Sequence, residues 1–162
     1  MKNKRYQIRD ATIDDARQKG LVHYQAWQET YTGLMNDTYM KSMKAENCIN
    51  LAQRYYENTL VAIINNTLAG FACYGPCNDK GMEDFGEIIA LYLLKEYQKQ
   101  GIGKALLEAC IDRLSNYNKY CLWVLNTNHK AIEFYKKAGF EFNGDEKQEI
   151  LISPITELRM IK

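Results

Sequence analysis

The stretch from Gln98 to Lys104, Gln-Lys-Gln-Gly-Ile-Gly-Lys, has the composition of a loop that binds an anion. It follows the apolar run 88–94 and leads into an amphipathic segment that starts at about Gly101. Two glycines separated by one residue let backbone N–H groups approach a ligand closely, and a helix N-terminus adds partial positive charge. A lysine in the first turn is disfavoured by about 0.3–1 kcal/mol unless an anion is bound there. The pattern therefore predicts a phosphate or pyrophosphate site.

The two commoner nucleotide-binding patterns do not fit this stretch. A P-loop needs Ser or Thr after its lysine, but Ala105 follows Lys104, and no glycine precedes at the required spacing. The dinucleotide fingerprint fails because Leu106 occupies the position of its third glycine. What remains is Gln-x-x-Gly-x-Gly, made by Gln98, Gly101 and Gly103.

A second segment, 128–140, reads Asn-His-Lys-Ala-Ile-Glu-Phe-Tyr-Lys-Lys-Ala-Gly-Phe. Asn128 is a strongly favoured helix N-cap, and Gly139 is well placed to stop the same helix. Phe134 and Tyr135 fall on one apolar face together with alanines. Taken alone, that face indicates core packing as readily as a site.

Together, the two segments resemble the signatures of the GNAT N-acetyltransferase superfamily. The first matches its pyrophosphate-binding pattern, and the second matches N-x-x-A-x-x-F-Y-x-x-x-G-F at every defined position. The resemblance implies an acyltransferase that moves the acetyl group of acetyl-coenzyme A (acetyl-CoA) to a primary amine by direct attack. It assigns donor binding to the backbone of Leu91, Tyr92 and Leu93, to the loop residues Gln98, Lys99, Gln100, Gly101, Ile102, Gly103 and Lys104, and to Asn128 and Tyr135.

The resemblance also implies two catalytic residues. Tyr135 is the expected general acid for the departing coenzyme A thiolate, and a phenol suits that role because it stays protonated near neutral pH. Glu87 is the expected general base for the amine, directly or through water. The alternative is that Glu87 is only a solvent-facing charge at a strand end, and the nearby Glu83 and Asp84 dilute its signal.

Two aromatic residues, Trp27 and Tyr31, are the expected substrate-binding residues. They recur at helical spacing, and Trp-x-x-Thr-Tyr-x-Gly resembles a version common in the superfamily, where the end of this helix roofs the acceptor. An aromatic stripe is also typical of core packing, so both interpretations stay open. The acceptor itself, a small-molecule amine or a peptide N-terminus, is not identified by the sequence.

The elements that position these residues follow from hydrophobic periodicity and turn residues. Thr12 with Asp15 three residues later resembles a capping box, and the turn 65–67 joins two strands into a hairpin. We expect one α/β domain over residues 1–162, with a mixed, mostly antiparallel sheet of about six to seven strands flanked by about four helices. The expected strands are 6–9, 59–64, 68–74, 88–94, 120–125, and two near 149–151 and 155–161; the expected helices are Thr12 to about Gly33, about 38–57, one from about Gly101, and about 128–138.

Composition narrows the remaining function classes. The net charge is +1 over 162 residues, so no general basic field favours nucleic acid or membrane surfaces. The longest apolar run, 88–94, is too short to span a bilayer, and no signal-peptide pattern is evident. Five scattered cysteines lack zinc-site spacing, which favours reduced thiols, a cytoplasmic location and no metal. We expect a monomer or homodimer.

Two alternatives to the enzyme come from other function classes. A non-catalytic acyl-CoA-binding sensor or regulatory module would share the donor loop. A nucleotide- or nucleic-acid-binding domain is the other, and the near-neutral charge and the failed nucleotide patterns argue against it.

Overall fold

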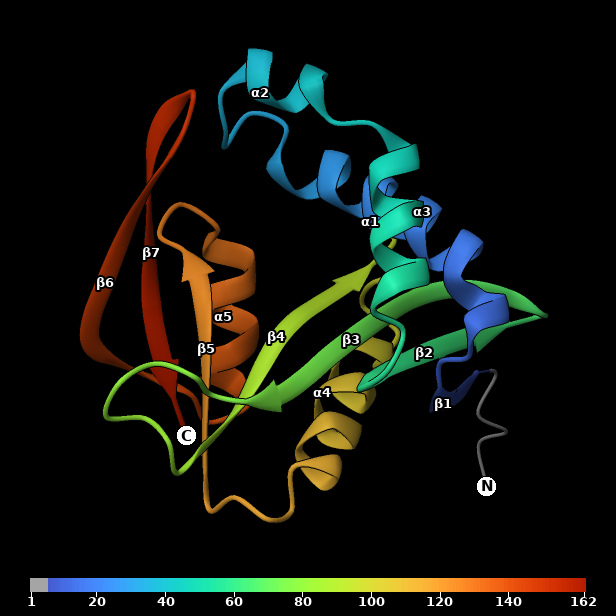
Figure 1. The fold of residues 1–162 in the computed structure, drawn as a ribbon. Helices are drawn as coiled ribbons and strands as arrows, with labels where there is room; N and C mark the ends of the chain where they lie inside the picture. The colour runs from blue at the N-terminus through green and yellow to red at the C-terminus, as the bar shows by residue number, and fades with distance from the viewer. Residues whose placement is uncertain (1–5) are drawn as a thin grey trace.

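The computed structural model describes residues 6–162. In this part of the chain, seven strands form one sheet in the order β1-β2-β3-β4-β5-β7-β6, with five α-helices packed around it (Figure 1). Only β4 and β5 run parallel, which confirms the expected mixed, mostly antiparallel α/β fold. No helix in residues 6–162 is long and apolar enough to cross a membrane. The elements are β1 (Gln7–Asp10), α1 (Ala16–Tyr31), α2 (Asp37–Ser42), α3 (Ala45–Arg54), β2 (Thr59–Ile64), β3 (Thr67–Pro76), β4 (Phe85–Leu93), α4 (Ile102–Arg113), β5 (Lys119–Leu125), α5 (His129–Lys137), β6 (Glu141–Leu151) and β7 (Ser153–Ile161).

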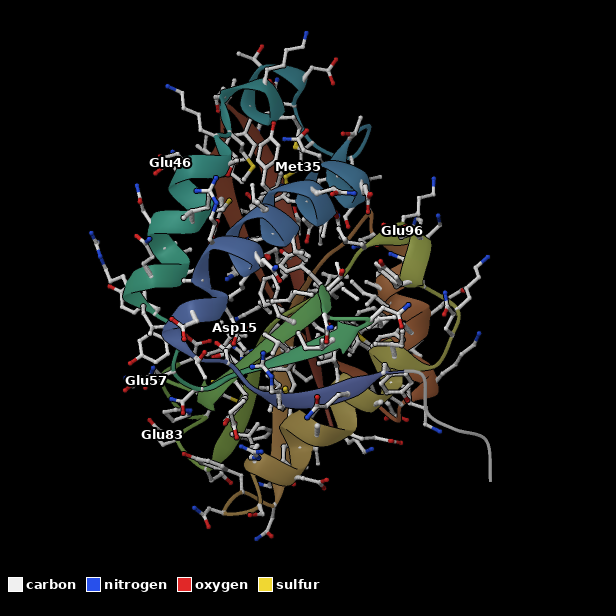
Figure 2. All side chains as sticks on the ribbon, turned by 90° about the vertical axis from the view of Figure 1, so that its right-hand side faces the viewer. Asp15, Met35, Glu46, Glu57, Glu83 and Glu96 are labelled. Atoms are coloured by element: carbon white, nitrogen blue, oxygen red, sulfur yellow. The ribbon has the colours of Figure 1, made fainter. Side chains whose placement is uncertain are left out.

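The helices divide between the two faces of the sheet. On one face, α4 and α5 bury residues such as Leu106 and Ile132 against the strands, and on the other α1 buries Val22 and Ala26. Figure 2 shows α1 and α3 lying side by side on one side of the strands and α4 on the other. Gly20 permits this close pairing, because a Cβ there would lie 2.4 Å from the Cα of Ile49. We call these two faces the α4 face and the α1 face.

The expected hairpin at 59–74 is confirmed. β2 and β3 pair antiparallel up to Ile64 and Thr67, and a two-residue turn joins them. Asn65 and Asn66 both have positive φ, 47° and 63°. Such a turn suits the right-handed twist of paired strands, and Asn tolerates this backbone region better than other non-glycine residues.

The single helix expected over 38–57 is wrong, because two helices occupy that range. α2 and α3 are separated by Met43 and Lys44, both of which have extended backbone. The break lets the two segments pack on different neighbours. α3 lies along α1, whereas α2 reaches the end of α1, where the Gln28 side chain donates to Met40 O at 3.1 Å. Tyr55 lies just past the end of α3 and is 61% exposed.

The strand expected near 149–151 is also wrong in extent, because β6 begins at Glu141. Most side chains of β6 are exposed and polar, so its sequence does not alternate apolar and polar residues in the way that predicts a strand. Backbone pairing with β7 makes it a strand nonetheless, as the outermost member of the sheet. At the far end of this hairpin, Asn36 before α2 donates to Ser153 at 2.9 Å. This contact ties the β6–β7 turn to the α1–α2 connection.

The start of the first helix is close to the expected position. A 3₁₀ turn, Ile13–Asp15, precedes α1, and the Asp15 carboxylate accepts from the backbone N–H of Thr12 at 2.8 Å. Arg9 holds the same carboxylate at 2.8 Å, and the pKa of Asp15 is lowered chiefly by this hydrogen bond. The expected capping interaction between Thr12 and Asp15 is therefore present.

Candidate active site

The strands β4 and β5 separate halfway along their length. They pair in parallel only over Phe85–Glu87 and Lys119–Cys121. Beyond this, β4 stays with β3 up to Leu93, and β5 stays with β7 up to Leu125. Figure 1 shows the two strands diverging toward their C-terminal ends. The inner edge of β4 is therefore free of a strand partner.

The free edge of β4 presents particular backbone groups. Leu94 N donates to Ala69 O on β3 at 3.0 Å, and N–H groups of a strand alternate sides. Alternation directs the N–H of Tyr92 toward β3 and those of Leu91 and Leu93 toward the gap. Of the three residues expected to offer backbone groups to the donor, Leu91 and Leu93 have the suitable direction. Tyr92 instead contributes its side chain, on the α1 face.

The loop after β4 ends in an open helix N-terminus. Lys99 and Gly101 have φ of 60° and 81°, and α4 begins at Ile102. Gly101 is the N-cap and supplies no side chain, and no acidic residue occupies the first turn. Alternation of right- and left-handed backbone next to a helix N-terminus directs N–H groups into a concave anion site. The predicted phosphate loop therefore has the expected backbone form.

The glutamines of the loop brace it rather than project from it. The Gln98 side chain donates to Leu93 O at 3.0 Å, and Gln100 donates to Glu96 O at 3.1 Å. The first of these bonds connects the loop directly to the free edge of β4. Lys104 is exposed and lies 3.7 Å from Glu108. Gln98 thus places the loop relative to the strand edge.

The fold does not require a glycine at position 103 for steric reasons. A Cβ at this position would meet only ring carbons of Phe134, at 3.5 and 3.7 Å, which is ordinary contact. The fold alone would accept a side chain here, so the absence of one is better explained by a ligand that approaches the helix end. Phe134 belongs to α5, so this contact also brings α5 beside the loop.

Tyr135 lies on α5 on the α4 face of the sheet. Its ring packs edge-on against Phe134 and Phe140, with centroids 5.1 and 5.8 Å away. The residue is 9% exposed, and burial raises the pKa of its phenol well above the ordinary value. It packs in the same cluster as Leu91 and Leu93. Tyr135 is therefore a core aromatic in the same cluster as two side chains of the free strand, and its role as a general acid stays a prediction.

Asn128 caps α5 as expected, because its side-chain oxygen accepts from Ala131 N at 3.2 Å. We expect Asn128→Ala to lower the free energy of unfolding by about 1 kcal/mol through loss of this cap. Denaturant unfolding measures the change. Asn128→Asp keeps an acceptor oxygen and is the matched control. Equal stability of the alanine variant and the parent would rule out a capping contribution.

Glu87 lies inside β4, two residues after the strand begins, and on the α1 face. A bulge follows it: β3 pairs Tyr74 with Ile88 and Cys73 with Ala90, so Ile89 is an extra residue. The bulge shifts the alternation, so that Glu87 and Tyr92 share the α1 face despite their odd spacing. Sequence periodicity alone would place them on opposite faces.

The surroundings of Glu87 favour its protonated form more than water does. The side chain is half-buried, and burial followed by the charge of Asp79 raises the pKa of its carboxyl. The positive charges of Arg159 and Lys147 act in the opposite direction but do not cancel the rise. A carboxyl with a raised pKa suits proton abstraction from an amine better than an ordinary surface glutamate does.

Trp27 and Tyr31 belong to an aromatic cluster on the α1 face. The ring centroid of Trp27 lies 5.1 Å from Tyr31 and 6.3 Å from Tyr39, and His23 lies 5.3 Å from Tyr92. The indole N–H of Trp27 is buried without a partner among the described residues. Burial, followed by the charge of Lys19, lowers the pKa of His23 to about 4, so this ring is neutral. The two predicted substrate residues are thus brought together beside β4.

Sequence reasoning missed a second cluster on the α1 face. Arg159 of β7 is 3% exposed, pairs with Asp79 and lies with its guanidinium 4.1 Å from the ring centroid of Trp123. Lys147 lies 4.8 Å from the same ring centroid and 3.0 Å from Glu157. These residues come from three strands and one loop with no common motif. The sequence offered one clue to this cluster. Trp123 lies two residues after Cys121 in an expected strand, so the two side chains face the same side of the sheet.

A family model described as the acetyltransferase (GNAT) family matches residues 13–140. The chain belongs to the GNAT acetyltransferase family. It is similar to the uncharacterized N-acetyltransferase YuaI of Bacillus subtilis, with 27% identity over 150 residues, covering 88% of this chain and 84% of the relative. The spermine/spermidine N(1)-acetyltransferase of Bacillus subtilis is 30% identical over 115 residues, covering 67% of this chain and 74% of the relative.

Solved structures give the same assignment. The crystal structure of the PaiA N-acetyltransferase of Thermoplasma acidophilum in complex with coenzyme A superposes with a TM-score of 0.76 and 26% identity, covering 97% of this chain and 98% of that one. The GNAT resemblance drawn from the two motifs is therefore confirmed, and this GNAT chain is an N-acetyltransferase, an acyltransferase enzyme. Within residues 6–162, no group of three or more His, Cys, Asp or Glu side chains is arranged to hold a metal ion.

Proposed function

We propose that this GNAT chain transfers the acetyl group of acetyl-CoA to a primary amine by direct attack within a ternary complex. The observation that carries the proposal is the free edge of β4. On the α4 face, this edge is flanked by the open N-terminus of α4 and by Tyr135. On the α1 face lie Glu87 and the aromatic cluster. Donor and acceptor thus meet at the strand edge from opposite faces of the sheet.

Donor binding uses backbone groups for the most part. The N–H groups at the start of α4 receive the pyrophosphate, and the exposed Lys104 adds positive charge. The backbone N–H groups of Leu91 and Leu93 have no strand partner in the described part of the chain, so they hydrogen-bond the pantetheine arm and the thioester oxygen of the donor. Asn128 contacts the same arm from the start of α5. Side-chain identity matters little for most of these contacts.

The chemical step requires three proton transfers: two from the acceptor nitrogen and one to the departing thiolate. The acceptor ammonium gives a proton to Glu87, directly or through water, and the neutral nitrogen attacks the thioester carbon. Negative charge develops on the thioester oxygen, where strand N–H groups stabilise it. The carbon–sulfur bond then breaks, and the thiolate takes a proton from the Tyr135 hydroxyl. The attacking nitrogen loses its second proton, which returns through water to the Tyr135 phenolate, and Glu87 releases the first proton to solvent. The amide and free coenzyme A leave.

A covalent acetyl-cysteine intermediate is disfavoured by the thiols present. Cys110, which packs near Tyr135, is buried, and burial raises the pKa of its thiol to about 12. Burial likewise raises the pKa of Cys121. A thiol that stays protonated is a poor nucleophile. Direct attack by the amine is the simpler route.

The acceptor is an amine that is cationic in solution. Carboxylates and electron-rich aromatic rings on the α1 face favour such a ligand before it loses its proton. One relative described above is named for spermine and spermidine, which supports polyamines as the first acceptors to test. Release of coenzyme A thiol in the presence of polyamines, amino acids and peptide N-termini tests the proposal. Tight acetyl-CoA binding without thiol release for any amine would contradict it.

Glu87→Gln tests the base. We expect kcat/KM to fall by about 10² or more and the acidic limb of its pH profile to disappear. The sign follows from the chemistry: Glu87 acts only when deprotonated, and its pKa is raised, so activity falls as the pH drops through that raised value. Glu83→Gln, at an exposed neighbouring position, is the matched control. A glutamine variant that kept both its rate and its acidic limb would remove Glu87 from the mechanism.

A further inference from the structure

The ammonium of Lys147 occupies a site built to hold a cation. Its Nζ lies 3.0 Å from Glu157 Oε2 and 3.7 Å from Glu149 Oε1. It also lies 4.8 Å from the centroid of the Trp123 ring. An aromatic face together with carboxylates is a general recognition site for an ammonium group. We call Trp123, Glu149 and Glu157 the ammonium seat.

The Trp123 ring of the ammonium seat is held in place by Asp79 and Arg159. The Trp123 indole N–H donates to Asp79 at 3.3 Å, and the buried Arg159 guanidinium packs on the ring at 4.1 Å from its centroid. Arg159 is itself paired with Asp79 and lies 3.6 Å from Asp145. Trp123 is therefore fixed by contacts that do not involve Lys147.

The lysine in the seat is held much less firmly. Lys147 is 38% exposed on β6, the outermost strand, so its long side chain has room to leave. An exposed ion pair and an exposed cation–π contact each stabilise a side chain only weakly, because water competes for the same ammonium. A competing ammonium delivered by a bound ligand can displace it at little cost.

The seat lies on the same face as the proposed base. Trp123 is two residues beyond Cys121, which pairs with Glu87 across the parallel ladder. Glu157 lies close enough to Tyr31 and Tyr92 for its charge to act on both phenols. The seat therefore borders both the base and the aromatic cluster, where the acceptor is expected.

We propose that the ammonium seat binds a second ammonium of the acceptor, and that Lys147 is an internal occupant which such an acceptor displaces. This inference rests on the proposed function. It defines the preferred acceptor as a flexible diamine or polyamine: one amine loses its proton and reacts near Glu87, and another stays charged in the seat. A monoamine leaves Lys147 in place and gains nothing from the seat.

The test compares 1,7-diaminoheptane with heptylamine in a thiol-release assay and reports selectivity, the ratio of their kcat/KM values. We expect Lys147→Met to raise this ratio about fivefold or more by removing the competing ammonium. Glu157→Gln should lower it about tenfold by removing a carboxylate of the seat. Lys136→Met is the matched control, because Lys136 lies over Phe142 at 5.0 Å on the outer part of the molecule. It should leave the ratio unchanged.

Failure of the ammonium seat and failure of the proposed acetyl transfer give different results. An unchanged or lower ratio in Lys147→Met, with an unchanged ratio in Glu157→Gln, would overturn the seat while leaving acetyl transfer itself intact. If no amine released thiol, the proposed function would fail, and calorimetry of 1,7-diaminoheptane on the coenzyme A-bound protein would test the seat. Binding should then be tighter in Lys147→Met than in the parent, and equal binding would overturn the proposal. Thermal unfolding checks each variant, and Lys147→Gln replaces the methionine variant if that one does not fold.

Discussion

Replacing Gly103 by aspartate is expected to weaken acetyl-CoA binding by about 100-fold or more while the protein stays folded. The reason is electrostatic. The new carboxylate would stand in the first turn of α4, where the pyrophosphate is expected, and two like charges about 4 Å apart near a protein surface repel by about 4 kcal/mol. Calorimetric titration with acetyl-CoA measures the loss.

The same substitution should not damage the fold. A Cβ at Gly103 meets only Phe134, at 3.5 Å or more. A carboxylate near a helix N-terminus is favourable by about 0.3–1 kcal/mol, so thermal stability should hold or rise. Gly103→Ala is the matched control, because it adds the same Cβ without charge. Position 101 is less suitable, since its φ of 81° would strain any side chain. Unchanged affinity in Gly103→Asp would refute the phosphate loop.

Tyr135→Phe is expected to lower kcat by about 10² or more while leaving acetyl-CoA affinity close to that of the parent. The ring is held edge-on by Phe134 and Phe140, and phenylalanine preserves that packing. Only the hydroxyl is lost, and with it the proton donor for the thiolate. The rate should recover in part with acyl donors whose thiol leaves without protonation.

The pH profile adds a second check on Tyr135. Because burial raises the pKa of its phenol above the ordinary value, the residue stays a proton donor throughout the neutral and moderately basic range. No basic limb from Tyr135 is therefore expected below about pH 10. Turnover equal to that of the parent would leave Tyr135 as a core aromatic only. A matched variant, Phe134→Leu, separates a general packing defect from loss of the hydroxyl.

The features predictable from sequence are those specified by local chemistry. Paired asparagines at a two-residue turn, Asn128 as an N-cap and the stop at Gly139 each act over a few residues, and the structure has each of them. The helix split at Met43 and Lys44 and the length of β6 were not predictable. Each depends on a distant partner: α1 for the first and β7 for the second.

The candidate site divides in the same way. The donor half is a contiguous motif, because an anion site needs several N–H groups from one turn and glycines to shape that turn. The acceptor half is assembled from separate strands. Glu87 reaches the α1 face only through the bulge at Ile89, and Lys147, Trp123 and Glu157 meet only because β5, β7 and β6 are neighbours.

By itself, then, the sequence indicated the family and the fold class through two motifs that each lie within a short stretch of the chain, and it predicted a phosphate loop from Gln98 to Lys104. The tertiary structure decided which backbone groups of β4 are free, which face carries Glu87, and that a lysine ammonium fills a seat of Trp123 and two carboxylates. The physical reason is that register, bulges and strand order place side chains with no regular spacing in the sequence.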